Sequence, residues 1–326
     1  MKQKIRIGIV GYGNLGKGAE KAVRQNPDME LVAVFSRRAL SGTESKVPAL
    51  SITQAADYQD KIDVMLLCGG SLTDLAEQGP QFAALFNTVD SFDTHAKIPE
   101  YYQKMDAVAR GAGKLAAISV GWDPGLFSLN RLLAGAVLPD GKDYTFWGKG
   151  VSQGHSDAIR RVAGVKNACQ YTIPYEESVN AVRAGADPVS DAKKLHWRDC
   201  YVVAADGADP AAIEQEIKTM PNYFDGYKTE VTFLTEAEFK QHHTNIPHGG
   251  FIFRSGATNN GQNKHIIEFA LKLDSNPEFT SSVLTAYARA VYRLAQTGQT
   301  GAVTVFDIPF GLLSPEDPAE LRRKLL

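Results

Sequence analysis

Six residues near the N-terminus constrain the fold of this chain more than any other stretch. The segment Gly11-Tyr12-Gly13-Asn14-Leu15-Gly16 follows the apolar run Lys4–Val10 directly, and a helical pattern from Leu15 to Gln25 continues it. A second apolar run, Glu30–Phe35, comes next. A strand, a glycine-rich turn and a helix in this order present unpaired backbone N–H groups and the positive end of the helix dipole to a pyrophosphate. The order of elements therefore predicts a dinucleotide-binding unit.

The end of the second strand indicates which dinucleotide binds. An acidic residue about 20 residues after the glycines would accept from a ribose 2′-hydroxyl, as NAD requires. Ser36-Arg37-Arg38 stands there instead. Two guanidinium groups offer charge-assisted donors to a 2′-phosphate, so we expect NADP as the cofactor. The residues expected to bind it here are Gly11, Tyr12, Gly13, Asn14, Leu15, Ser36, Arg37 and Arg38.

Charge and cysteine usage narrow the class of protein. The 326-residue chain has a formal net charge of −2, which gives no reason to expect nucleic acid or an acidic membrane as partner. Cys68, Cys169 and Cys200 are odd in number and widely spaced, which argues against a disulfide framework or a zinc site. No apolar run reaches the length of a membrane span, and Met-Lys-Gln-Lys leads straight into a strand without a signal peptide. We therefore expect a cytoplasmic enzyme.

Strand and helix patterns alternate in the first third of the chain. The expected strands there are Lys4–Val10, Glu30–Phe35, Ile62–Cys68, Asn87–Ser91 and Lys114–Val120, with a helix at Ile98–Gly111. This alternation predicts an α/β fold with a Rossmann-type, doubly wound parallel sheet over residues 1–120.

The character of the chain changes after residue 120. One helix, Leu126–Leu138, is followed by strand-like pieces at Tyr144–Trp147, Cys200–Ala204, Glu230–Leu234 and Lys264–Leu273. Strict alternation in the last of these is typical of a sheet with one buried face. We expect a second, α+β domain with a largely antiparallel sheet over residues 121–296, ending in a helix from Thr280 to Gln296. The segment 297–326 is expected to pack back on the first domain.

The residues after each strand of an open parallel sheet are the place to look for ligands. Cys68-Gly69-Gly70-Ser71-Leu72-Thr73 follows the third strand, and we expect Cys68, Gly69, Ser71 and Thr73 to contact the cofactor, a solvated loop being the alternative. Asp90-Ser91-Phe92-Asp93-Thr94-His95 follows the fourth strand and places two carboxylates where a nicotinamide should lie. Gly121-Trp122-Asp123-Pro124-Gly125 follows the fifth, where Asp123 could instead be a helix N-cap before Pro124.

Several strings along the whole chain resemble one enzyme family. They include Ser152-Gln153-Gly154-His155-Ser156-Asp157 and Pro247-His248-Gly249-Gly250, which are more specific than the glycine turn, together with Phe146-Trp147-Gly148, Thr219-Met220-Pro221 and Leu313-Ser314-Pro315-Glu316. With the Gly11, Ser36 and Gly121 segments, they resemble the meso-diaminopimelate D-dehydrogenases. The resemblance implies NADP-dependent, reversible oxidative deamination of meso-2,6-diaminopimelate at its D-centre. The products would be L-2-amino-6-oxopimelate and ammonia, and the enzyme a homodimer of the bacterial lysine and cell-wall pathway.

The residue types suit such a substrate, which carries a carboxylate and an ammonium at each end. Arg198 can bind one carboxylate through two hydrogen bonds, and by resemblance Arg198, Thr172 and His248 hold the L-centre. Asp93 and Asp123 could hold the reacting ammonium. Trp122, Trp147, Gln153, Gly154 and Asn276 complete the expected substrate site.

Hydride leaves the D-carbon only from the neutral amine, so some group must take a proton. Asp93 and Asp123 are the catalytic candidates, because carboxylates screened from water can have raised pKa values; water or a histidine could serve instead. His155 and the pair His242-His243 are the histidines to consider for a metal. A metal is not expected, since the adjacent His242 and His243 cannot easily share one ion and amine oxidation needs no Lewis acid.

Two other functions remain open at this point. One is another NADP oxidoreductase of the same architecture. It could resemble dihydrodipicolinate reductase, or a sugar dehydrogenase that uses Lys97 as its base. The other is a non-catalytic NADP sensor, which would not need Arg198, Thr172 and His248.

Overall fold

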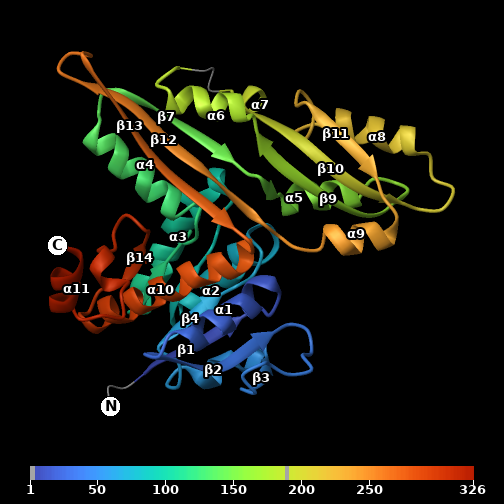
Figure 1. The fold of residues 1–326 in the computed structure, drawn as a ribbon. Helices are drawn as coiled ribbons and strands as arrows, with labels where there is room; N and C mark the ends of the chain where they lie inside the picture. The colour runs from blue at the N-terminus through green and yellow to red at the C-terminus, as the bar shows by residue number, and fades with distance from the viewer. Residues whose placement is uncertain (1–3, 188–190) are drawn as a thin grey trace. The chain divides into compact units, whose positions relative to one another are not determined.

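The computed structural model describes residues 4–187 and 191–326, which form two compact units. Unit 1 comprises residues 1–129 and 277–326, and unit 2 comprises residues 130–276. Each unit is described by itself below (Figure 1).

Unit 1 is built on a seven-stranded sheet in which all paired strands run parallel. The strand order is β14-β6-β5-β4-β1-β2-β3. The bounds are β1 Ile5–Val10, β2 Met29–Ser36, β3 Ala49–Ser51, β4 Val64–Leu67, β5 Asn87–Asp90, β6 Leu115–Ala117 and β14 Gly301–Val303. The order reverses between β1 and β4, which is where open sheets of this type bind their ligands. The expected Rossmann-type sheet is therefore present.

Helices cover both faces of this sheet because its buried strands are apolar on both sides. Ile7 and Ile9 of β1 belong to a core cluster that also contains Leu284 and Tyr287 of α10 (Asn276–Gln296). On the other face, Leu67 of β4 clusters with residues of α2 (Ala76–Ala83) and α3 (Ile98–Gly111). Helix α1 (Asn14–Gln25) begins right after the glycine turn and packs with the first cluster.

The domain limits differ from those expected at residues 120 and 296. Helix α10 lies in unit 1 from residue 277, because its apolar face is buried against β1. Leu129 in helix α4 (Leu126–Val137) joins the same cluster, so the first division falls inside α4. The C-terminal segment supplies β14, which pairs with β6, and ends in α11 (Pro318–Leu325).

Unit 2 contains two smaller sheets. One is antiparallel, with the order β13-β12-β7, formed by β7 Gly141–Trp147, β12 His248–Thr258 and β13 Asn263–Leu273. The other has the order β11-β10-β9-β8, formed by β8 Gly150–Val151, β9 Val165–Pro174, β10 His196–Ala204 and β11 Thr229–Phe233. Only β10 and β11 pair in parallel. This agrees with the expected α+β domain, although its strands are divided between two sheets.

Short helices complete unit 2. They are α5 Gln153–Arg160, α6 Glu176–Arg183, α7 Ala192–Leu195, α8 Pro210–Thr219 and α9 Glu236–His242. Ile159 of α5 and Ile213 of α8 pack with Cys200 and Val202 of β10 in one core cluster. That packing fixes β10 and leaves alternate residues of the strand for other contacts. None of the helices in the described part of the chain is long and apolar enough to cross a membrane.

Candidate active site

The glycine turn after β1 has the geometry that a pyrophosphate requires. Gly11 has φ +88°, and a Cβ there would lie 3.2 Å from the Cys68 carbonyl. A Cβ on Gly16 would lie 2.0 Å from the carbonyl oxygen of Gly11, so the helix can approach the turn only with glycine at this position. Gly13, the N-cap of α1, provides no side-chain cap, and a Cβ on it would meet no other described part of the chain within 4 Å. The N–H groups at the start of α1 therefore face space that an anion can fill.

The other predicted residues of this turn have distinct surroundings. Asn14 is exposed, whereas Leu15 packs against the core, and its carbonyl accepts from Ser281 Oγ at 2.7 Å. The Tyr12 hydroxyl donates to Glu20, a fully buried residue of α1. Glu20 also accepts from the Ser45 N–H, so one carboxylate connects the turn to the loop after β2. Glu20 was not among the residues expected from the sequence.

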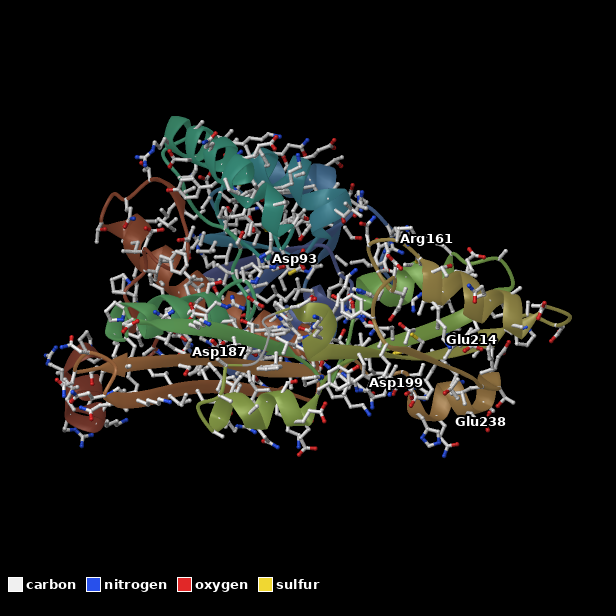
Figure 2. The ribbon with its side chains drawn as sticks, turned by 90° about the horizontal axis from the view of Figure 1, so that it is seen from above. Asp93, Arg161, Asp187, Asp199, Glu214 and Glu238 are labelled. Carbon is white, nitrogen blue, oxygen red and sulfur yellow. The ribbon has the colours of Figure 1, made fainter. Side chains whose placement is uncertain are left out.

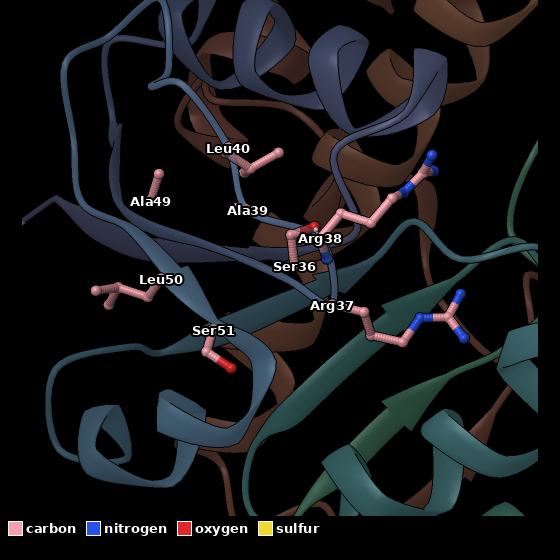
Figure 3. Close-up of a pocket in the computed structure, with 8 residues that line it drawn as sticks. All are labelled: Ser36, Arg37, Arg38, Ala39, Leu40, Ala49, Leu50 and Ser51. Atoms are coloured by element: carbon pink, nitrogen blue, oxygen red, sulfur yellow. Dashed lines mark hydrogen bonds between the residues drawn. The ribbon is translucent and has the colours of Figure 1, made fainter.

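A cavity of about 330 Å³ lies at the end of β2, lined by Ser36, Arg37, Arg38, Ala39, Leu40, Ala49, Leu50 and Ser51 (Figure 3). None of these eight residues is acidic. Figure 3 shows both guanidinium groups extending away from Ala49 and Leu50. The Ser36 Oγ accepts from the Arg38 N–H at 3.1 Å, which turns the chain after β2. The cavity can accept a phosphate but has no carboxylate in its lining for a ribose diol.

The loop after β4 leads into η2 (Ser71–Leu75) and contacts the segments that follow β2 and β5. Arg37 forms an ion pair with Asp74 at 2.6 Å, and Asp74 Oδ2 also accepts from the Gly70 N–H at 3.0 Å. Ser71 Oγ accepts from the Asp93 N–H at 3.0 Å. Cys68 is buried, and burial raises the pKa of its thiol to about 12. Its backbone carbonyl borders Gly11. Thr73 is exposed, and Gly69 is half-buried beside Asp74.

The two candidate catalytic carboxylates follow neighbouring strands. β5 and β6 pair in parallel, so Asp93 and Asp123, which come after them, leave the same edge of the sheet. Asp93 is exposed. Trp122 is buried and meets Phe127 edge to face, with ring centroids 5.1 Å apart.

The structure corrects the alternative of Asp123 as a helix cap. Helix α4 begins at Leu126, two residues beyond Pro124. Trp122 and Gly125 close a tight turn through a β-bridge, and the Gly125 N–H donates to Ser128 Oγ at 3.2 Å. In a capping box, the side chain of the third helical residue accepts from the N–H of the N-cap residue. Ser128 and Gly125 stand in this relation, so Gly125 takes the N-cap position. Asp123 lies in the turn before it.

In unit 2, Arg198 is buried and lacks an acidic partner. Its side chain is 8% exposed, and it takes part in no ion pair among the described residues. Nη1 donates to Thr172 Oγ1 at 2.5 Å, while Nε has no hydrogen-bond partner in the described part of the chain. Tyr227 covers the guanidinium, with Cζ 4.1 Å from the ring centroid. A buried cation without an anion is costly unless a ligand supplies one.

Strand register places two further predicted residues beside Arg198. Thr172 of β9 lies opposite Arg198 of β10, and Gly150 of β8 lies opposite Thr172. A Cβ on Gly150 would come within 2.4 Å of the His248 ring, so this ring packs directly on Gly150. Gln170 Nε2 donates to Thr172 Oγ1 at 3.4 Å, which leaves the threonine hydroxyl proton to donate elsewhere. Thr172 and Arg198 therefore lie side by side in one sheet, and the ring of His248, at the start of β12 in the other sheet of unit 2, packs on Gly150 beside Thr172.

The remaining predicted residues lie around this sheet. The Trp147 N–H donates to Nε2 of buried His196 at 2.9 Å, and the two rings lie 5.6 Å apart. Gln153 and Gly154 are exposed in the first turn of α5. The Asn276 N–H donates to the Ile246 carbonyl at 2.9 Å, just before Pro247-His248.

Two side chains considered for other chemistry have structural surroundings. His155 packs edge to face on Tyr223 and Phe224, and burial, aided by the charge of Arg198, lowers its pKa to about 4. Lys97 is exposed and pairs with Glu100 at 3.4 Å. Within residues 4–187 and 191–326, no group of three or more histidine, cysteine, aspartate or glutamate side chains could hold a metal ion.

Comparisons with known proteins identify the family of the chain. Residues 121–275 match the family model of the diaminopimelic acid dehydrogenase C-terminal domain. The meso-diaminopimelate D-dehydrogenase of Ureibacillus thermosphaericus is 64% identical over 99% of both chains. The Corynebacterium glutamicum diaminopimelate dehydrogenase in complex with diaminopimelate has a TM-score of 0.92 and 47% identity, covering 99% of this chain and 100% of the other. An engineered D-amino acid dehydrogenase bound to NADP⁺ has a TM-score of 0.88 and 45% identity over the same shares. The chain thus belongs to the family of meso-diaminopimelate D-dehydrogenases, amino acid dehydrogenases that act on a CH–NH₂ group.

Proposed function

We propose that this enzyme oxidises the D-centre of meso-2,6-diaminopimelate with NADP⁺ and water, giving L-2-amino-6-oxopimelate, ammonium, NADPH and a proton. The reaction is reversible, and we place it in the cytoplasm, carried out by a homodimer. Family membership favours this over the reductase and sensor alternatives. The structural observation that carries the substrate assignment is the buried guanidinium of Arg198, which has no acidic partner among the described residues.

Arg198, Thr172 and His248 bind the L-centre in this proposal. A substrate carboxylate would supply the missing anion and could accept from Arg198 and from the Thr172 hydroxyl. Burial lowers the pKa of Arg198, but a guanidinium keeps its proton at any pH at which the protein is folded. The cation is therefore permanently charged and pre-positioned, which reduces the ordering cost of binding.

Asp93 and Asp123 hold the ammonium at the D-centre. Trp122, Trp147, Gln153, Gly154 and Asn276 are proposed to shape the rest of the substrate site. An ammonium placed between two carboxylates keeps its charge, so one of these carboxylates must take a proton before oxidation. Either aspartate can then return that proton or activate the water that attacks the imine carbon.

NADP is proposed as the cofactor, bound at the glycine turn and the Ser36–Arg38 cavity. When bound, its nicotinamide ring accepts the hydride. The uncapped start of α1 supports pyrophosphate binding at Gly11–Leu15, and the cavity without acidic lining supports a 2′-phosphate beside Ser36, Arg37 and Arg38. Cys68, Gly69, Ser71 and Thr73 border the cofactor by the same proposal.

The test is a stereochemical one. Purified protein should reduce NADP⁺ with meso-diaminopimelate, release one ammonium per NADPH, and show no activity with the L,L isomer, which has no D-centre. Analytical ultracentrifugation checks the dimer. Equal rates with both isomers would contradict the assignment of a D-centre, and preference for NAD⁺ would contradict the cofactor assignment.

A further inference from the structure

A buried carboxylate that the proposed reaction does not use lies at the end of β5. Asp90 is 0% exposed and takes part in no ion pair in the described part of the chain. Oδ1 accepts from the N–H groups of Phe92 and Ser119, at 3.0 and 3.1 Å, and Oδ2 accepts from the Tyr101 hydroxyl at 2.7 Å. All three donors are neutral, so the carboxylate is solvated by hydrogen bonds alone.

Two of these bonds reach the segments that carry the candidate catalytic residues. Phe92 immediately precedes Asp93, and Ser119 lies two residues beyond β6 in the segment that leads to Asp123. The Asp90 carbonyl also accepts from the Val120 N–H at 2.8 Å. Backbone and side chain of one residue therefore tie both segments to the end of β5.

The backbone at Ser119 needs such support. Its φ of +56° lies in the left-handed region, which is unfavourable for a residue with a side chain. The Ser119 Oγ has no hydrogen-bond partner within the described residues, so it does not stabilise this conformation. The hydrogen bond from the Ser119 N–H to the Asp90 carboxylate does.

The third bond fixes the carboxylate itself. Tyr101 stacks on Phe92 with ring centroids 4.1 Å apart, and its hydroxyl fits against Gly79, where a Cβ would lie 2.1 Å away. Burial raises the pKa of Asp90 to about 6, against the effect of its three hydrogen bonds. An apolar side chain would avoid that penalty but would leave the Phe92 and Ser119 N–H groups and the Tyr101 hydroxyl without this acceptor.

We propose that Asp90 is a positioning residue that holds the backbone of the Asp93 and Asp123 segments in register with each other. This inference rests on the proposed roles of those two aspartates. Asp90 is fully buried, so it acts through the two segments.

The test compares Asp90→Leu, which fills the volume but accepts no hydrogen bond, with Asp90→Asn. The amide oxygen of Asp90→Asn can still accept from both N–H groups while its NH₂ donates to Tyr101. With diaminopimelate, we expect kcat/KM to fall at least about tenfold in Asp90→Leu and to stay within about threefold in Asp90→Asn. The dissociation constant for NADP, measured without substrate, should change less than about twofold in both.

Thr88→Ala is the matched control, because Thr88 is a fully buried residue of the same strand that contacts neither segment through its side-chain oxygen. It should lower the melting temperature but keep kcat/KM within about twofold, measured well below that temperature. If Asp90→Leu does not fold, Tyr101→Phe replaces it and should lower kcat/KM by about threefold or more. Wild-type kinetics in the variant that folds, or an equal loss in Thr88→Ala, would overturn the proposal.

A double-mutant comparison separates this inference from the proposed function. If Asp90 acts through Asp93, Asp90→Leu combined with Asp93→Asn should lose little more activity than Asp93→Asn alone. Fully multiplicative losses would show that Asp90 acts elsewhere. Wild-type kinetics in Asp93→Asn and Asp123→Asn would instead refute the roles of the aspartates themselves.

Discussion

The guanidinium of Arg198 lies over the ring of Tyr227, 4.1 Å from its centroid. An aromatic face attracts a cation without neutralising it, because the ring carries only a quadrupole. Tyr227 thus fixes the position of Arg198 and leaves its charge for a ligand. A carboxylate in the same place would compete with the substrate.

Arg198→Met should abolish recognition of the distal carboxylate, because it removes the charge and keeps most of the length. We expect kcat/KM for meso-diaminopimelate to fall by about tenfold to a hundredfold or more, from the loss of roughly 1.5–3 kcal/mol per charged hydrogen bond. Activity on simple D-amino acids should fall less. Arg161→Met, at an exposed arginine of the same unit (Figure 2), should stay near wild type. Loss of NADP binding in Arg198→Met would mean that Arg198 is structural.

Arg37→Ala should weaken NADP without weakening NAD. One charge-assisted contact with the 2′-phosphate contributes roughly 1.5–3 kcal/mol, so KM for NADP should rise about tenfold to a hundredfold. Michaelis constants for both cofactors provide the measurement. Arg323→Ala, which removes an exposed arginine paired with Glu320, serves as the control. Equal preference for the two cofactors in the wild type would contradict the phosphate site.

Asp123→Asn and Asp93→Asn should each lose about a hundredfold or more in turnover, the usual contribution of a general base. Both variants keep the shape, and Gly125, not Asp123, caps α4, so melting temperatures should stay within a few degrees. Asp57→Asn, at an exposed position of the same unit, should have wild-type kinetics. Unchanged turnover in both active-site variants would require another proton acceptor.

His196 should make the enzyme sensitive to acid. Nε2 accepts from the Trp147 N–H, so Nδ1 carries the proton and donates to the Ala192 carbonyl at 3.1 Å. Burial lowers the pKa of His196 to about 4, below the unfolded value of 6.5. The unfolded chain therefore binds a proton first as pH falls. This stabilising contribution is complete above about pH 6.5 and is lost towards pH 4, at most roughly 3 kcal/mol.

Denaturant unfolding of the wild type and His196→Gln at pH 7 and pH 5 measures this effect. The difference in unfolding free energy between the two proteins should be smaller at pH 5. Only the wild type loses the stabilising contribution of His196 as the pH falls. A difference that is independent of pH would show that His196 does not titrate as its burial implies.

The sequence was most informative where neighbouring residues determine the structure. The turn at Gly11–Gly16 and the strands on either side of it could be predicted because their glycines, apolar runs and helix follow one another directly. The alternation of strands and helices predicted the doubly wound parallel sheet, but not its short strands β3 and β14. β12 was not among the expected strands; it begins with Gly249 and Gly250, whose φ values of +151° and +159° are ones that glycine adopts easily.

The site was harder to predict where it depends on register and burial. Thr172 and Arg198 are 26 residues apart and meet only because β9 and β10 pair antiparallel in one register. The pattern Asp90-Ser91-Phe92-Asp93 offers two carboxylates, and nothing in it says that the first is buried and the second exposed. Glu20, Asp74 and Tyr227 act through contacts with distant loops, for which the sequence contains no local signal.

The proposed anion site at Arg198 is assembled within unit 2, on strands that contribute nothing to the parallel sheet and its glycine turn. Recognition of the far end of the substrate and the binding of phosphates can therefore change independently. If Thr172, Arg198 and His248 hold the L-centre as proposed, substitutions at these positions should alter which amino acids are accepted and leave the proposed cofactor residues unchanged. Selection for a new D-amino acid would thus need to explore only a handful of positions on three adjacent strands and the start of a fourth.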